Sequence, residues 1–215
     1  MPCLVLAGKF WENTAYQDWT DKDAEKLLKK SPWSQKVTLS TGGGQPGGSS
    51  RGMPSATSGS SRGGGGTPGG GELGEMNFIV RWDSALPIRQ AALRAHYGPE
   101  VDSIKEVQEA LNSEVTHYAV SLIGFPARMV QQNPSRFASM ASNAVLKRKN
   151  QDPIVAESVD VRPGDPPDGL VFYFPRTDPI TLEDKEVEFQ LEFGRLKIKR
   201  KFQLKKMVYD GKLEL

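Results

Sequence analysis

The clearest pattern of apolar and polar positions lies near the end of the chain. Apolar residues alternate with acidic or amide residues in one segment and with lysines in the next; they are Val187, Phe189, Leu191 and Phe193, then Leu196, Ile198, Phe202 and Leu204. Strict alternation is typical of half-buried strands. Gly194-Arg195 suits a type II′ turn between them, which predicts a hairpin with Glu192 opposite Lys197. Arg200 breaks the alternation and is expected on the apolar face, opposite Phe189.

Similar patterns predict the remaining elements. Thr20 and Asp23 form a near-match to a capping box, and Pro87 suits the first turn of a helix. The predicted helices cover residues 21–30, 84–97, 101–112 and, more briefly, 135–142. The predicted strands cover residues 37–40, 76–82, 117–123, 145–149, 154–161 and 170–174. We therefore expect an α+β fold with a mainly antiparallel sheet of about seven or eight strands and three or four helices.

A Gly/Ser/Pro-rich tract over residues 42–74 interrupts the chain and holds 15 of its 22 glycines. Such a composition buries too little apolar surface to offset its ordering entropy, so we expect a disordered loop insertion. The flanking strands then pair as a hairpin with an oversized loop. Residues 9–41 and 75–215 are predicted to form one domain; two domains are the alternative.

The first residues carry a short apolar run, with Val5 and Ala7 at the −3 and −1 positions of a candidate cleavage site. We interpret residues 1–8 as a signal-peptide remnant, which predicts an extracytoplasmic protein, periplasmic or secreted. The alternative is an unstructured start with a chance apolar run. No other apolar run approaches the ~18 residues of a membrane span, so no transmembrane segment is expected.

Aromatic residues are dense from Phe10 to Trp33. Because exposed tryptophan and tyrosine mark interaction surfaces, Trp11, Tyr16 and Trp19 are the candidate partner-binding residues. The alternative is that this segment docks on its own domain.

Catalytic and metal-binding patterns are scarce. Cys3 is the single cysteine and the histidines are His96 and His117, so no zinc spacing can be assembled. The two G-x-S-x-G matches, starting at Gly48 and Gly59, lie in the Gly-rich tract without a strand before or a helix after them. The carboxylates around the strand at 170–174 lack calcium-loop spacing and suit turns and caps; they are Asp165, Asp168, Asp178, Glu183 and Asp184. We assign no catalytic residue, cofactor or metal ligand.

Basic residues are frequent between Arg195 and Lys206, yet the formal net charge of the chain is only +2. Alternating lysines are typical of the solvated face of a strand, so no nucleic-acid partner is expected.

Four motifs carry a family resemblance: Phe10-Trp11-Glu12, Ser31-Pro32-Trp33, Arg81-Trp82-Asp83-Ser84-Ala85-Leu86-Pro87 and Phe174-Pro175-Arg176-Thr177-Asp178-Pro179-Ile180. Together with the Gly-rich tract they resemble a group of uncharacterised, exported acidobacterial proteins. The resemblance implies export and assigns no residue a role. The expected function is non-enzymatic binding or assembly outside the cytoplasm, with an unknown protein or envelope partner. A hydrolase using carboxylates and a histidine is the alternative.

Overall fold

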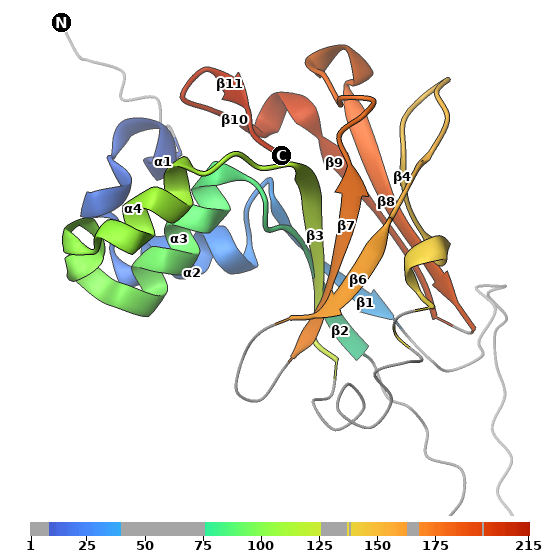
Figure 1. The fold of residues 1–215 in the computed structure, drawn as a ribbon, viewed down its shortest axis with the longest axis horizontal. Coiled ribbons are helices and arrows are strands. Elements are labelled where there is room, and N and C mark those ends of the chain that lie inside the picture. The colour runs from blue at the N-terminus through green and yellow to red at the C-terminus, as the bar shows by residue number, and fades with distance from the viewer. Residues whose placement is uncertain (1–8, 40–75, 126–136, 138, 163–167, 195) are drawn as a thin grey trace, which may run out of the picture.

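The computed structural model of the chain describes residues 9–39, 76–125, 137, 139–162, 168–194 and 196–215. Helices gather on one side, and the other side holds two antiparallel sheets (Figure 1). The predicted α+β class is confirmed. The helices are α1 (Phe10–Asn13), α2 (Asp21–Lys29), α3 (Leu86–Tyr97) and α4 (Lys105–Asn112), with short 3-10 helices η1 (Tyr16–Asp18), η2 (Gly98–Ser103), η3 (Ala141–Asn143), η4 (Leu182–Asp184) and η5 (Leu204–Lys206).

The first sheet has the strand order β1-β2-β3-β7-β6. Its strands are β1 (Ser34–Leu39), β2 (Met76–Trp82), β3 (His117–Ile123), β7 (Gly169–Pro175) and β6 (Ser158–Val161). β1 pairs with β2, as predicted for the strands that flank the Gly-rich tract. Trp82, Val120 and Phe172 are cross-strand neighbours on the buried face of this sheet. Arg81 and Ser121 pair on the opposite face.

The second sheet has the order β5-β4-β8-β9, with strands β5 (Ile154–Val155), β4 (Ala144–Lys147), β8 (Glu186–Phe193) and β9 (Leu196–Gln203). The predicted hairpin register is confirmed, with Glu192 opposite Lys197. Gly194 has φ 59°, a value that favours glycine and that the first position of a type II′ turn requires. Arg200 lies opposite Phe189 as expected and is half-buried. Nothing in the structure explains why an arginine occupies this position.

The predicted mainly antiparallel arrangement is confirmed, but the described strands divide between these two sheets and a small ribbon of β10 (Val208–Tyr209) and β11 (Lys212–Leu213), where one sheet of about seven or eight strands was expected. The predicted strand over residues 154–161 is also two strands, β5 and β6, in different sheets. The Ala156 N–H donates to the Ala144 carbonyl at 3.0 Å in the second sheet, and the Glu157 N–H donates to the Tyr173 carbonyl at 2.8 Å in the first. The chain therefore changes sheet here, as strands do at sandwich corners.

The helices follow their predicted signals closely. Thr20 and Asp23 form the capping box at the start of α2, and Pro87 lies in the first turn of α3. The helix predicted over residues 101–112 begins only at Lys105 and is preceded by η2. Ile104, with φ −93° and ψ 106°, is extended and separates the two. Of the expected helix at 135–142, residues 135, 136 and 138 lie outside the described residues, and the 3-10 helix η3 begins at its last two positions.

The C-terminal residues join the helices to the sheets. The Trp33 indole N–H donates to the Glu214 carbonyl at 2.8 Å. The Glu214 carboxylate accepts from the Leu86 backbone N–H at 3.3 Å, at the start of α3, where the N-cap Ala85 has no side-chain cap. Glu214 therefore ties the start of α3 to Trp33, the residue directly before β1. Within the described parts of the chain, every helix is too short or too polar to cross a membrane.

Candidate functional site

The three aromatic residues singled out by the sequence are buried in their own domain. Trp11, Tyr16 and Trp19 expose 6%, 9% and 0% of their surface. Trp19 donates its indole N–H to the Thr14 carbonyl at 3.0 Å, and Arg94 of α3 donates to the Trp19 carbonyl at 2.8 Å. The segment thus docks on its own domain, and none of the three rings is available to a partner in this structure.

The two histidines lie in different settings. His96 is exposed on α3 against Tyr97. His117, at the start of β3, has its Nε2 2.9 Å from Glu157 Oε2 and its Nδ1 2.9 Å from Thr116 Oγ1. Hydroxyl, imidazole and carboxylate are therefore linked by hydrogen bonds beside the start of β3.

Three of the loop carboxylates highlighted by the sequence, Asp168, Asp178 and Asp184, have arginine, amide or capping partners. Asp168 pairs with Arg162 at 2.7 Å, and Asp178 pairs with the buried Arg148. This ion pair lowers the pKa of the exposed Asp178 carboxyl through its hydrogen bond to Arg148. Asp184 caps η4 and accepts from Gln151 at 2.7 Å. Asp165 lies outside the described residues, among which no three potential metal ligands gather.

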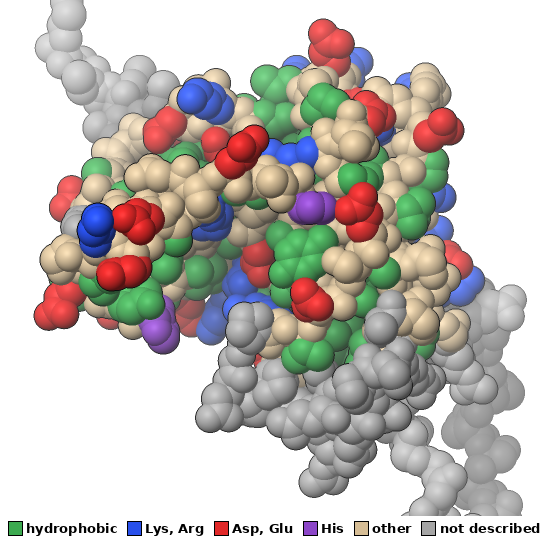
Figure 2. Space-filling model, viewed as in Figure 1, with side chains coloured by type: hydrophobic (Ala, Val, Ile, Leu, Met, Phe, Trp, Pro, Cys, Tyr) green, Lys and Arg blue, Asp and Glu red, His purple; other side chains and the backbone are tan. Residues whose placement is uncertain are grey.

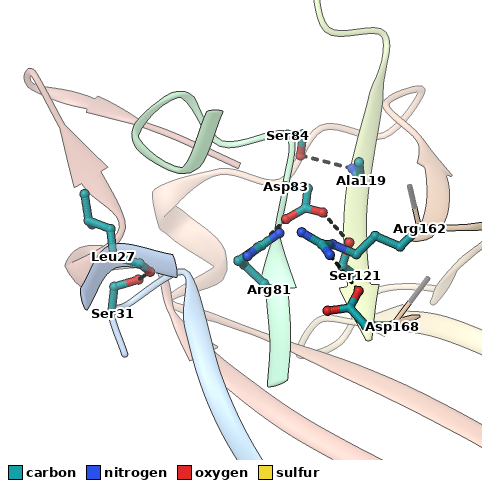
Figure 3. A network of polar contacts seen from close by, with 9 residues as sticks. All are labelled: Leu27, Ser31, Arg81, Asp83, Ser84, Ala119, Ser121, Arg162 and Asp168. Carbon is teal, nitrogen blue, oxygen red and sulfur yellow. Dashed lines mark hydrogen bonds and ion pairs between the residues drawn. The ribbon is translucent and has the colours of Figure 1, made fainter. Parts of the chain in front are cut away.

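A polar network covers the outer face of the first sheet (Figure 3). Asp83 follows β2 and accepts hydrogen bonds from Arg81 and Ser121 on its two carboxylate oxygens. Arg162, paired with Asp168, reaches over the sheet toward Asp83. The Arg81 side chain is only 6% exposed, so its charge depends on Asp83 for compensation.

A pocket of about 300 Å³ opens beside this network, where the helices meet the first sheet. Its lining comes from the β2–α3 and α4–β3 connections together with residues of α3, β3 and β7. Its apolar surface comes from Val115, Ala119 and Tyr173, and its polar surface from Asp83, Ser84, Arg89, Glu114, Thr116 and His117. One histidine lies near the middle of the face seen in Figure 2, between hydrophobic and acidic side chains.

Hydrogen bonds to the backbone hold the walls of the pocket. The Ser84 hydroxyl accepts from the Ala119 N–H at 3.0 Å, which leaves its own proton free to donate. Arg89 reaches from α3 to the Ala110 carbonyl at the end of α4 and to Ser113 Oγ at 3.3 Å. Burial, followed by the nearby Asp160 and Asp83 carboxylates, raises the pKa of the Tyr173 phenol. The Tyr173 side chain therefore lines the pocket as a neutral phenol.

Comparisons with known proteins do not identify the chain. No protein-family model matches it, and no curated protein sequence matches it. One solved structure, described as a novel protein of unknown function from Burkholderia pseudomallei, is similar over 58% of this chain and 72% of its own, with 9% identity and a TM-score of 0.34.

Proposed function

We propose that this chain is a non-enzymatic binding protein and that the pocket beside β3 is its ligand site. The observation that supports this proposal is that polar groups of the pocket floor are held in place by hydrogen bonds within the fold. Asp83 uses both carboxylate oxygens within the fold, and Ser84 is bonded to the β3 backbone. Binding sites are typically concave and mostly apolar, with a few preformed polar groups, and 300 Å³ is at the small end of their range.

A hydrolase is the second candidate, and the line of Thr116, His117 and Glu157 favours it. A hydroxyl next to an imidazole that is itself oriented by a carboxylate is the arrangement that activates a nucleophile. However, the His117 and Glu157 side chains are 39% and 56% exposed, and Thr116 is exposed as well. Electrostatic stabilisation of a transition state is strongest where water is excluded, so this setting supports binding better than catalysis.

The proposed location is extracytoplasmic, periplasmic or secreted. Its support is the sequence pattern of residues 1–8, which lie outside the described residues, and the resemblance to exported proteins. The proposed partner is a protein or another envelope component. Nucleic acid has less support, because the lysines of β9 have acidic neighbours: Lys197 lies 3.8 Å from Glu192, and Lys201 lies 2.7 Å from Glu186.

The proposal is tested by filling the pocket. Ala119→Leu places a larger side chain on its floor, and Ala95→Leu makes the same change on the exposed face of α3. Nuclear magnetic resonance or calorimetry would compare amino acids, dicarboxylates, sugars and phosphates as ligands. We expect at least one class to bind the wild type and Ala95→Leu but not Ala119→Leu. If every ligand that binds also binds Ala119→Leu, the pocket is not the site.

The hydrolase alternative has its own assay. Turnover of p-nitrophenyl esters that disappears in His117→Ala and persists in His96→Ala would contradict the non-enzymatic proposal.

A further inference from the structure

The wall of the pocket carries two opposite charges, the half-buried Arg89 and the exposed Glu114, that form no ion pair among the described residues. Arg89 bonds to a carbonyl and a hydroxyl. Burial lowers the pKa of Arg89 and the nearby Glu214 carboxylate partly opposes this, although no described carboxylate forms an ion pair with Arg89. Glu114 likewise has no ion-pair partner among the described residues, although it lines the same pocket. Asp83 differs from both because Arg81 already compensates its charge.

These charges restrict the chemistry of a ligand. A phosphate or dicarboxylate would meet Glu114 and Asp83 as well as Arg89, and a simple cation would meet Arg89. A ligand with one anionic and one cationic group pairs with both charges, because its charge-assisted hydrogen bonds to Arg89 and Glu114 replace the water bound to these side chains. Val115, Ala119 and the Tyr173 ring add apolar surface to the same pocket.

Resting on the proposed binding function, we infer that the pocket takes a small zwitterion of the α-amino-acid class. The carboxylate of the ligand binds Arg89, and its ammonium group binds Glu114. The free proton of the Ser84 hydroxyl and the neutral Tyr173 phenol are further donors for the carboxylate end. A volume of about 300 Å³ holds an amino acid with a medium-sized side chain.

Three matched probes test this inference by titration calorimetry: L-leucine, its deamino analogue isocaproate and its decarboxylated analogue isoamylamine. We expect L-leucine to bind at least about tenfold more tightly than either analogue, since each analogue lacks one charge-assisted contact. Arg89→Gln should weaken L-leucine and isocaproate and leave isoamylamine unchanged. Glu114→Gln should weaken L-leucine and isoamylamine and leave isocaproate unchanged.

Two further variants separate charge from structure. Arg89→Lys keeps the positive charge and should retain L-leucine binding within about tenfold, which matters because Arg89 also bonds to α4. Glu106→Gln neutralises an exposed glutamate of α4 outside the pocket and should change nothing. A thermal melt of each variant establishes that it is folded.

The outcomes separate the inference from the function on which it rests. Equal affinity for the three probes, or binding that survives both Arg89→Gln and Glu114→Gln, overturns the inference. If no zwitterion binds while another class binds in a way that Ala119→Leu abolishes, the inference is overturned and the binding function stands. If no class depends on Ala119, both are wrong.

Discussion

Removal of the Phe202 ring should be among the most destabilising single changes in the second sheet. Phe202 is fully buried, lies opposite Val187 and meets Trp82 of the first sheet edge-to-face, with ring centroids 5.8 Å apart. Phe202→Ala loses buried apolar surface, leaves a cavity between the sheets and breaks the aromatic pair. We expect a loss of about 3 to 5 kcal/mol in the free energy of unfolding.

Two neighbouring variants calibrate that value. Phe193 is half-buried at the end of the same hairpin, so Phe193→Ala should cost about 1 to 2 kcal/mol. Lys199 is exposed opposite Gln190, so Lys199→Ala should stay within about 0.5 kcal/mol.

Urea denaturation followed by tryptophan fluorescence measures all three, with an unchanged m value as the sign of an intact two-state transition. For a chain of this length, the Phe202→Ala loss corresponds to a fall in Tm of about 6 to 20 °C. A one-residue slip of the register would carry the lysines inward and make Lys199→Ala the costly variant. That ranking, or three equally small effects, would refute the reasoning.

Three further predictions concern the network, the pH dependence and the Gly-rich tract. Asp83→Asn should lower the free energy of unfolding by about 3 to 5 kcal/mol, because it leaves the buried Arg81 charge unpaired. In the same denaturation assay, the double variant Arg81→Met/Asp83→Asn should recover part of that loss. If the losses of the two single variants simply add in the double variant, the stabilising pair is contradicted. Burial, followed by Asp210 and Glu214, raises the pKa of Tyr209 to about 12, so its contribution to stability should be complete below pH ~10 and lost as pH rises through about 12. Absorbance titration of wild type and Tyr209→Phe checks this, and a phenol titrating near its ordinary pKa would contradict it. Deleting residues 44–71 should change stability by no more than about 2 kcal/mol, and loss of the cooperative melt would contradict the single-insertion interpretation.

Local patterns determine a large part of this fold. The hairpin register follows from alternation together with the position of Gly194, because a shift of one residue would turn every apolar side chain outward. The capping box at Thr20 is similarly local. Assignment of strands to sheets is a different matter: Ile154 and Val159 have the same strand character, and only their hydrogen-bond partners place them in different sheets.

The candidate site was not predicted from the sequence. Arg81 and Ser121 are polar residues at outward positions of strands that otherwise look buried. Their polar side chains at these alternate positions were the signal available in the sequence. Their dependence on Asp83, and the approach of Arg162 from a distant part of the chain, are tertiary facts. His117 was singled out by its residue type alone, without Glu157 as its partner.

The network and the pocket share Asp83, and this decides which variants can report on function. A change at Asp83 removes the compensation of Arg81 and reshapes the pocket at once, so lost binding in that variant would say nothing about ligand contact. Arg89 lies in α3 and Glu114 lies in the connection from α4 to β3, and both stand outside the network. Their charges can be removed one at a time while Arg81, Asp83 and Ser121 keep their bonds. Ligand preference measured in those variants therefore isolates the chemistry of the pocket from the stability of the sheet beneath it.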